Sequence, residues 1–558
     1  MKKQRLARPL RVRDPISTSI TVLIIVSLIV FNLAPLIKIF VQSFTDASGD
    51  TYSIMGYVRA FQYRANREAL VNTLVSSTCS AVLSTVIGFI FAYCSCYVKM
   101  RAKKLFDFVG LLPIVSPPFS VALSLILLFG AKGLISKTLL GISNANIYGF
   151  KGLLFAQTFS FFPMAYLMLK GVLSTIDPSV EEAARDMGAS RWKTFTKVTL
   201  PLALPGIGNA FLVVFIKCAA DFGNPITIGG GYGTLATQIY FQAVGGYEMQ
   251  RCCALAMILL IMTLIIYMIS QLILEKRTFV TITGKATRER VLIEEKHIAI
   301  PLTAFCTICS VIVLGIYVMI PLVSLFKLWG VDFTPTFENY VTAWKLSKDA
   351  FIDTIKLAAI TTPLTGILAM VMSFLIVRKH NRASRLMEIL GMVGMIVPGT
   401  ILGYAYILQF NTPPFLLTGT FVIMIISCAL RYLPLGLRSG ITSLRQIDPS
   451  IEESASDLGA NSAQVFIKVT LPLIKSSFFG GLVYTFVRTM TSVSALIFLL
   501  SAKHKLLTIT ILDMVDRGRY GVASALSTCL IIIVYIAIFL LYQLIGLFGV
   551  NKKEIKLM

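Results

Sequence analysis

Charged residues are scarce in this sequence. Asp, Glu, Lys and Arg make up 14% of its 558 residues, whereas soluble globular proteins carry roughly 25%. Hydrophobic residues reach 56%, and the mean hydropathy is +0.79. This composition excludes a water-soluble globular protein, and the apolar residues gather in repeated runs long enough to cross a bilayer of about 30 Å. We therefore expect an all-α integral membrane protein, because helices satisfy their own backbone hydrogen bonds in lipid.

Clustered histidines, the signs of a disulfide framework and a phosphate-binding loop are also lacking. The three histidines (His297, His380 and His504) are scattered, which excludes the spacing of a metal site. The ten cysteines fall in or beside apolar runs, so we interpret Cys306 and Cys309 as small thiols packed between helices. No G-x-x-x-x-G-K-[ST] motif occurs, so ATP is not expected to bind this chain by that route. We expect no cofactor, no metal site and no catalytic residue in the chain.

Acidic residues are few beside basic ones: 27 Asp and Glu stand against 51 Lys and Arg, a net charge of +24. In a soluble protein this excess would suggest nucleic acid as a partner. Here the basic residues flank apolar runs, so we expect contact with membrane lipid and no nucleic acid. The first run is too long for a cleaved signal peptide and follows six basic residues: Lys2, Lys3, Arg5, Arg8, Arg11 and Arg13.

Twelve apolar runs are predicted to span the membrane. They cover about 16–40, 71–97, 105–130, 150–173, 202–229, 251–273, 299–326, 352–377, 386–410, 414–437, 473–500 and 521–548. An even number of spans places both termini on one side of the membrane. The predicted inside segments carry most of the Lys and Arg, as the positive-inside rule requires, so both termini are expected in the cytoplasm.

The sequence contains an internal repeat. Residues 176–201 and 447–472 are identical at 16 of 26 positions without a gap, at an offset of 271. Upstream the halves match at an offset of 281, for example Glu68–Thr73 against Asp349–Thr354. We predict a first half at 1–274, a cytoplasmic linker at 275–298 and a second half at 299–558. Two six-span repeats in the same order predict parallel halves with a translocation path on their shared axis.

The best-matched stretch of the repeat falls in a loop after the fourth and tenth spans. In the first copy Asp177 and Pro178 have the pattern of a helix N-cap and first helical residue. Glu181 and Glu182 suit the positive end of that helix, and Gly188 permits a sharp turn. The second copy repeats this plan with Asp448, Pro449, Glu452, Glu453 and Gly459. Shared packing alone would conserve the spans best, so we expect a soluble partner to bind this loop.

These residues carry a family resemblance. Glu182-Ala183-Ala184, Gly188 and Leu200-Pro201 at this spacing resemble the EAA loop of binding-protein-dependent ABC importer permeases. The second copy, Glu453 to Pro472, departs only by a serine at 454. The resemblance implies a fused pair of permease units in a bacterial plasma (inner) membrane. It also implies that two copies of an ATP-binding subunit, which bind ATP and Mg²⁺, dock on Asp177, Glu181, Glu182, Ala183 and Gly188, and on Asp448, Glu452, Glu453 and Gly459.

The solute is indicated by two further segments. Residues 220–230 and 489–499 resemble the ferric-iron branch of the family, which implies import of ferric iron. That branch also contains relatives for phosphonates and other phosphorylated solutes, so a phosphorylated organic anion is an alternative. A secondary transporter of the major facilitator type would also have twelve spans in parallel halves. Asp516–Arg519 is similar to its loop signature but is predicted on the outer side.

Two cations occupy matching positions within spans. Lys217 lies near the middle of the fifth predicted span, and Arg488 lies at the same place in its repeat. Intramembrane charge costs roughly 2.5–3.5 kcal/mol on insertion scales, so Lys217 and Arg488, with Asp221 and Ser492 one turn away, are expected to line the path. The alternative is that these two cations are paired locally or extend to the membrane surface, and do not line the path. On the path these cations would repel bare ferric ion and attract phosphate or anion-complexed iron.

The longest predicted outward connections are residues 47–69 and 328–350. With the glycine run at 229–233, which we interpret as an external loop, they are expected to receive an extracytoplasmic solute-binding protein. The chain itself contains no soluble capture domain by this interpretation.

Overall fold

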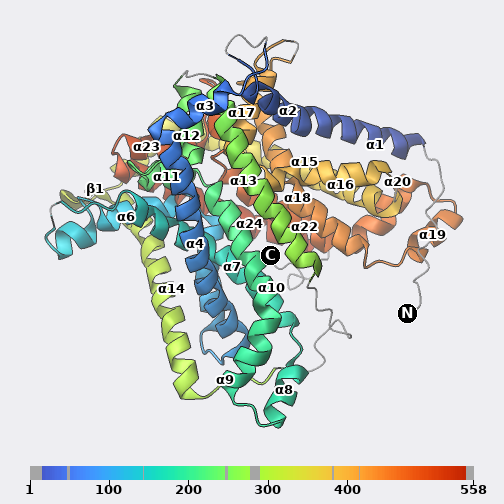
Figure 1. The fold of residues 1–558 in the computed structure, drawn as a ribbon, viewed down its shortest axis with the longest axis horizontal. Helices are drawn as coiled ribbons and strands as arrows, with labels where there is room; N and C mark the ends of the chain where they lie inside the picture. Colours follow the sequence, from blue (N-terminus) through green and yellow to red (C-terminus); the bar gives the residue numbers. More distant parts are fainter. Residues whose placement is uncertain are drawn as a thin grey trace. The chain divides into compact units, whose positions relative to one another are not determined.

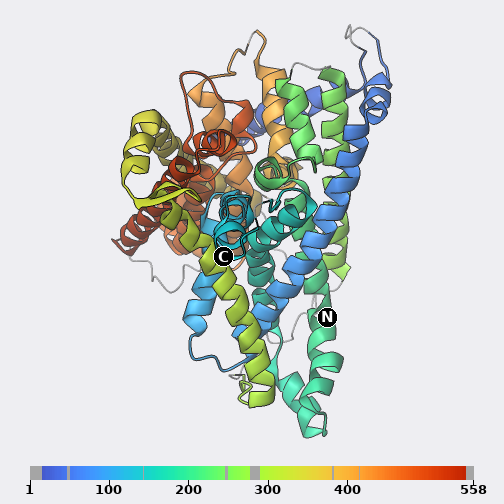
Figure 2. The same ribbon diagram turned by 90° about the vertical axis from the view of Figure 1, so that its left-hand side faces the viewer.

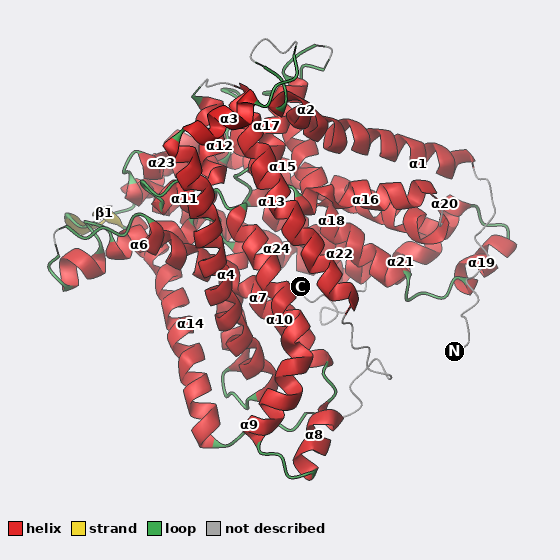
Figure 3. Ribbon diagram, viewed as in Figure 1, coloured by secondary structure: helices red, strands yellow, loops and turns green. Residues whose placement is uncertain are grey.

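The computed structural model describes residues 15–46, 51–142, 144–245, 249–276, 290–379, 382–413 and 415–547. Several predicted features lie outside the described residues: the six N-terminal basic residues, positions 47–50 of the first outward segment, and linker positions 277–289. Nearly all of the described chain is helical (Figure 3). The all-α prediction is confirmed.

Figures 1 and 2 show the helices, of which the first half of the chain contributes α1 to α13. These are α1 (Pro15–Leu28), α2 (Ala34–Ser43), α3 (Met55–Gln62), α4 (Arg64–Tyr97), α5 (Lys103–Val115), α6 (Ser120–Phe129), α7 (Phe150–Thr175), α8 (Pro178–Asp186), α9 (Arg191–Thr194), α10 (Leu200–Ala219), α11 (Gly223–Ile228), α12 (Leu235–Val244) and α13 (Met249–Lys276). Short π-helical turns lie at Ile29–Leu33, Leu134–Leu139 and Phe195–Thr199.

The second half repeats this order. It contains α14 (Lys296–Ser324), α15 (Glu338–Lys379), α16 (Arg382–Ile396), α17 (Gly399–Phe410), α18 (Phe421–Leu444), α19 (Ser450–Asp457), α20 (Ser462–Val465), α21 (Leu471–Leu473), α22 (Lys475–Met490), α23 (Leu507–Asp516) and α24 (Tyr520–Leu547). A π-helical turn covers Phe466–Thr470, and a 3₁₀ turn covers Leu496–Phe498. The strands β1 (Phe326–Leu328) and β2 (Asp332–Pro335) form a small antiparallel hairpin that pairs Phe326 with Pro335.

Ten described helices are long and apolar enough to cross a membrane, or up to 12 if each bent pair is one span. The predicted span 386–410 is not one straight helix: α16 and α17 meet at 112°, as a broken span or a re-entrant pair. Pro398 lies at this break, where proline removes a backbone donor and disfavours helix in the residue before it. The predicted span 105–130 is likewise two helices, with Pro117 and Pro118 in the gap between α5 and α6.

Two other predicted spans extend too far. The run 202–229 is helical in α10 only to Ala219, and the run 473–500 is helical in α22 only to Met490. These two ends are separated by the 271-residue offset of the repeat. Helix breaks and helix ends therefore recur at matching positions of the repeat, although they cannot be predicted from the apolar runs.

The chain forms two compact units that are not continuous in sequence. One comprises residues 1–54, 347–510 and 532–558, and the other comprises 55–346 and 511–531. In the first unit α1 packs on α16 and α2 on α17, and Asn32 Nδ2 donates to the Leu390 carbonyl at 3.2 Å. In the second, α14 packs on α5 and α6, and Ser124 Oγ donates to the Ile316 carbonyl at 2.7 Å. Each sequence half thus contributes its first helix to the unit built mainly from the other half.

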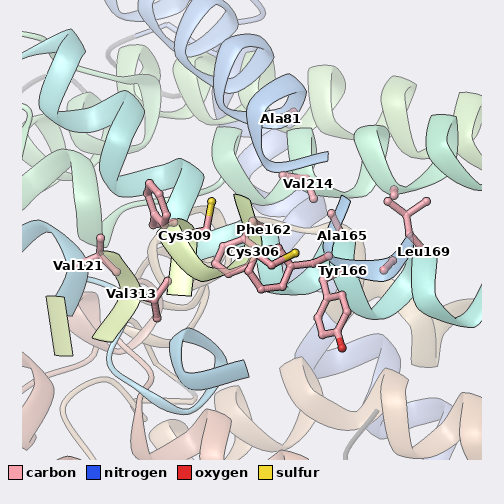
Figure 4. Packing of buried hydrophobic residues seen from close by; sticks show 14 of the residues in the cluster. Ala81, Val121, Phe162, Ala165, Tyr166, Leu169, Val214, Cys306, Cys309 and Val313 are labelled. Carbon is pink, nitrogen blue, oxygen red and sulfur yellow. The ribbon is translucent and has the colours of Figure 1, made fainter. Parts of the chain in front are cut away.

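The unit of residues 55–346 and 511–531 has a core where α4, α7, α10 and α14 meet (Figure 4). Phe162 and Tyr166 of α7 are fully buried there. Cys306 and Cys309 are also buried in this cluster, as small thiols packed between helices. Gly88 lets α4 approach α7, because a Cβ at this position would lie 2.7 Å from the Tyr166 backbone nitrogen.

This close approach predicts opposite effects of two glycine-to-alanine substitutions. Gly88→Ala should lower the free energy of unfolding by about 1–3 kcal/mol, because the added methyl group overpacks against backbone. Gly208→Ala is the matched control, since nothing lies within 4 Å of its added Cβ in α10. It should be neutral or stabilising by about 0.5–1 kcal/mol. Thermal unfolding of the purified protein in detergent measures both, and equal midpoints would contradict the packing argument.

Candidate functional site

The repeated loops begin with the same capping interaction. Asp177 Oδ1 accepts a hydrogen bond from the Ser179 amide at 3.0 Å, and Asp448 Oδ1 accepts one from the Ser450 amide at 3.0 Å. These amide bonds lower the pKa of both exposed carboxyls. The ionised caps are therefore formed at neutral pH and are lost as the pH falls through the lowered pKa. Pro178 is the first residue of α8 as predicted, whereas α19 begins only after Pro449.

The two adjacent glutamates of each loop have different environments. Glu181 and Glu452 are buried, with 5% and 1% of their surface exposed. Thr199 Oγ1 donates to Glu181 Oε1 at 2.5 Å, and Thr470 Oγ1 donates to Glu452 Oε1 at 2.8 Å. The sequence analysis did not predict which of the two adjacent glutamates is buried. The spacing of 18 residues between the buried glutamate and its threonine, which is the same in both copies, could have indicated it.

Each buried carboxylate also has an arginine partner. Arg378 Nε lies 2.7 Å from Glu452 Oε2, and Arg290 Nε lies 3.4 Å from Glu181 Oε2. In the first loop Tyr97 adds a hydrogen bond from its hydroxyl to Glu181 Oε1 at 2.8 Å. The buried glutamate therefore fixes each loop to the helices behind it, and sequence reasoning identified neither arginine.

The outer face of each loop is exposed. Glu182 and Glu453 are partly exposed, and Ala183 is exposed. Met187 and Leu458, which precede the turn glycines, are 83% and 90% exposed. The turns themselves require glycine, because Gly188 has φ +87° and Gly459 has φ +92°. The outer face of each loop thus carries one highly exposed apolar side chain next to a partly exposed glutamate.

A surface groove lies beside α8 in the first loop. Glu181 and Glu182 line it together with Arg185, Arg191 and Arg290. In Figure 1, α8 and α9 lie at one end of the helices α4, α7 and α10 that precede and follow them. A partner on this face would thus contact charged side chains next to the ends of long membrane helices.

The predicted path residues lie at helix ends and not in the middle of spans. Lys217 is in the last turn of α10, and Arg488 is in the last turn of α22. Both side chains are half-buried. The sequence predicts positions near the middle of the spans because the apolar runs continue beyond the helices. A cation in the last helical turn interacts favourably with the helix dipole, which lowers the cost of burying it.

The neighbours of these cations differ between the halves. Asp221 is buried, and its carboxylate accepts hydrogen bonds from Gln157 Nε2 at 3.2 Å and Asn224 Nδ2 at 2.9 Å. Ser492, the counterpart of Asp221, is buried as well. The guanidinium of Arg488 lies 5.5 Å from the centroid of the Tyr484 ring. Asp221 is thus held by amide side chains, and Arg488 lies beside an aromatic ring.

Sequence reasoning missed a third cation, Arg431 of α18. Its guanidinium lies 5.9 Å from the Tyr432 ring centroid, and the Tyr432 ring lies 6.4 Å from that of Tyr484. Arg431 Nη1 is buried, without a hydrogen-bond partner among the described residues. At the 271-residue offset Arg431 corresponds to Ser160. This cation could have been identified from the sequence, because an arginine lies inside the apolar run of α18.

Comparisons with known proteins found relatives that match most of the chain. A ferric transport system permease protein FbpB from Actinobacillus pleuropneumoniae is 34% identical, with 96% of this chain and 79% of that protein covered. A putative ferric transport system permease protein FbpB 1 from Haemophilus influenzae is 36% identical, with 86% and 77% covered. Among solved structures, a bacterial alginate ABC transporter in complex with an alginate pentasaccharide-bound periplasmic protein matches 49% of this chain and 97% of its own, with a TM-score of 0.41 and 17% identity.

The family model described as binding-protein-dependent transport system inner membrane component matches the chain twice, at residues 84–280 and 362–549. Each match contains one of the two repeated loops. The two matches together cover more than half of the chain, and the chain therefore belongs to the family of binding-protein-dependent transport system inner membrane components, as two family units fused in one polypeptide.

Proposed function

We propose that this chain is the permease subunit of an ATP-driven importer that carries ferric iron across a bacterial inner membrane. The observation that carries the proposal is the identity of 34% and 36% to ferric transport permeases over most of the chain. Both relatives are named for ferric transport, so this solute is favoured over a phosphorylated organic anion. The family membership disfavours a secondary transporter of the major facilitator type.

The energy for transport comes from a separate subunit in this proposal. The sequence has no phosphate-binding loop, so ATP and Mg²⁺ would bind to the partner. Two copies of that ATP-binding subunit would dock on the repeated loops, Asp177–Pro201 and Asp448–Pro472. The support for two copies is that both loops present the same surface, a partly exposed glutamate followed by a highly exposed apolar side chain. Both termini would then lie on the cytoplasmic side with the loops.

A solute-binding protein would deliver iron on the opposite side. The two outward segments contain exposed aromatic side chains, among them Tyr52, Phe337 and Trp344. The second segment also carries the β1–β2 hairpin, and the glycine run at 229–233 forms the turn between α11 and α12. Exposed aromatic rings are enriched at protein interfaces, which supports these segments as the docking surface.

The test of the whole proposal is iron uptake by proteoliposomes. These would contain the chain with its ATP-binding subunit, and a loaded binding protein would be added outside. Uptake of radioactive ferric iron should require ATP inside and the binding protein outside. Uptake driven by a proton gradient without ATP would contradict the proposal and favour a secondary transporter.

The docking surface predicts the effect of reversing its charge. The double variant Glu182→Lys/Glu453→Lys should weaken association with the ATP-binding subunit by about two orders of magnitude, because like charges at an interface cost several kcal/mol. Gly188→Val should have a similar effect on the first loop, since a β-branched residue is strained at φ +87°. Co-purification and ATPase activity measure both variants.

Glu68→Lys is the matched control for charge reversal. Glu68 is exposed at the start of α4, and its partner Arg64 is exposed as well. This variant should assemble normally. Normal assembly and uptake in the Glu182/Glu453 double variant would show that the loops do not dock the ATP-binding subunit.

The half-buried cations predict how the path selects charge. We propose that Lys217, Asp221, Arg488 and Ser492 line the path and that iron passes as an anionic complex. At an effective dielectric of about 20, a unit charge some 4 Å away contributes on the order of 4 kcal/mol. Lys217→Gln/Arg488→Gln should therefore slow uptake by orders of magnitude. Lys356→Gln, at an exposed lysine of α15, should leave uptake unchanged.

Labelling distinguishes a path from buried structural charges. Cysteines placed at 217 and 488 should react with aqueous thiol reagents in at least one state of the ATP cycle. If both stay unreactive throughout the cycle, the two cations do not line the path.

A further inference from the structure

The two repeated loops have the same buried glutamate but receive their arginine from different parts of the sequence. In the second loop the partner of Glu452 is Arg378, the penultimate residue of α15. Arg378 Nη2 also donates to Glu452 Oε1 at 3.1 Å. At the 281-residue offset the counterpart of Arg378 is Tyr97, the last residue of α4. Tyr97 offers a hydroxyl but no positive charge.

Arg290 supplies the missing charge in the first loop. This residue belongs to the connection between the sequence halves and has no counterpart in the repeat. Its guanidinium carbon lies 4.0 Å from the centroid of the Tyr97 ring, while Nε faces Glu181. Nη1 and Nη2 donate to the carbonyls of Leu173 and Ile176 at 3.2 and 2.7 Å, at the end of α7. Arg290 thus stacks on the counterpart of Arg378 and neutralises the counterpart of Glu452.

Both arginine–glutamate ion pairs are buried. The side chains of Arg290 and Glu181 are 12% and 7% exposed, and those of Arg378 and Glu452 are 9% and 1% exposed. Removing one member of a buried pair leaves an uncompensated charge and is strongly destabilising, whereas exposed pairs contribute little. The first loop therefore depends on Arg290 of the connection between the halves, whereas the arginine that pairs with Glu452 belongs to α15.

The neighbouring linker residues strengthen this attachment. Residues 290–295, which we call the linker clamp, follow the end of α4: the Ile293 amide donates to the Tyr97 carbonyl at 2.7 Å, and the Lys99 amide donates to the Ile293 carbonyl at 3.2 Å. At the other end Arg191 Nε of α9 lies 2.6 Å from Glu295 Oε1. Glu295 directly precedes α14. The linker clamp thus connects both helices of the first loop, α8 and α9, to the start of α14.

We propose that Arg290 is a positioning residue of the first coupling loop, performing there the role that Arg378 performs in the second. The linker clamp makes the first loop move with α14 as well as with α4, whereas the second loop is attached through Arg378 to α15. This inference rests on the proposed function only where it speaks of coupling; the attachment itself is tested separately.

The attachment is tested by hydrogen exchange of the complete chain in lipid nanodiscs. Arg290→Ala should accelerate exchange of α8 amides on the order of 100-fold, as expected for loss of one partner of a buried pair, with no change in α19. Arg378→Ala should do the reverse. Arg517→Ala, which breaks the exposed Arg517–Asp513 pair outside the linker clamp, is the matched control and should change neither loop. Unchanged exchange in α8 of Arg290→Ala would overturn the inference.

A charge transplant tests the role itself. Tyr97→Arg combined with Arg290→Ala copies the second loop's arrangement into the first, and it should restore slow exchange in α8. Arg290→Lys keeps the charge but not the forked donors, and should give an intermediate rate. If Arg290→Ala does not yield folded protein, recovery of folded protein in the double variant tests the same point. Failure of the transplant, with Arg290→Lys equal to Arg290→Ala, would overturn the charge role.

Coupling is measured on the same variants assembled with the ATP-binding subunit. In Arg290→Ala, stimulation of ATP hydrolysis by loaded binding protein should fall about tenfold, and the transplant should restore it. Altered exchange without altered stimulation would contradict coupling through this loop, leaving the attachment intact. Altered stimulation without altered exchange would overturn the attachment and leave the proposed coupling function standing.

Discussion

A lipid bilayer offers no hydrogen-bond partner to the peptide backbone, and this constraint decides most of what the chain can form. It explains why the described residues are nearly all helical and why the one strand pair is short and lies between α14 and α15. It also makes each interruption of a helix informative. The breaks before α6 and α17 contain Pro117 and Pro398 at matching places of the repeat. At the first break the Ser120 amide donates to the Pro117 carbonyl at 3.0 Å and Ser116 Oγ donates to the Pro113 carbonyl at 3.2 Å, so the freed groups find partners locally.

The two halves share the same structural requirements, but some of the residues that meet them differ between the halves. Glu181 with Thr199 and Glu452 with Thr470 are retained pairs, because a buried carboxylate needs its donors. The arginine that pairs with this carboxylate differs between the halves: it is Arg290 in the first and Arg378 in the second. The polar side chains near the end of α10 also differ between the halves. In the first half Gln157 and Asn224 both donate hydrogen bonds to Asp221. Their counterparts in the second half are Cys428, Ala495 and, for Asp221, Ser492.

Local sequence patterns predicted local structure well. The cap at Asp177, the turn at Gly188 and the duplicated order of helices depend on a few neighbouring residues and are visible in the sequence. The ends of α10 and α22 are not, because the apolar run continues past the last helical turn. Which of Glu181 and Glu182 is buried depends on the rotation of α8 against Tyr97, which is 84 residues away. The exchange of first helices between compact units is invisible for the same reason, since the repeat shows order along the chain and not which helices pack together.

The positions of Lys217 and Arg488 change how their charge should be understood. A lysine in the middle of an apolar helix is a large cost that demands a compensating function. In the last turn of a helix the cost is smaller, because the backbone carbonyls there are unpaired and carry partial negative charge. The cationic side chain at each helix end therefore balances the partial negative charge of the backbone carbonyls there. Arg431 of α18 has no cationic counterpart in the first half, because Ser160 stands at the matching position, so the local charge differs between the halves.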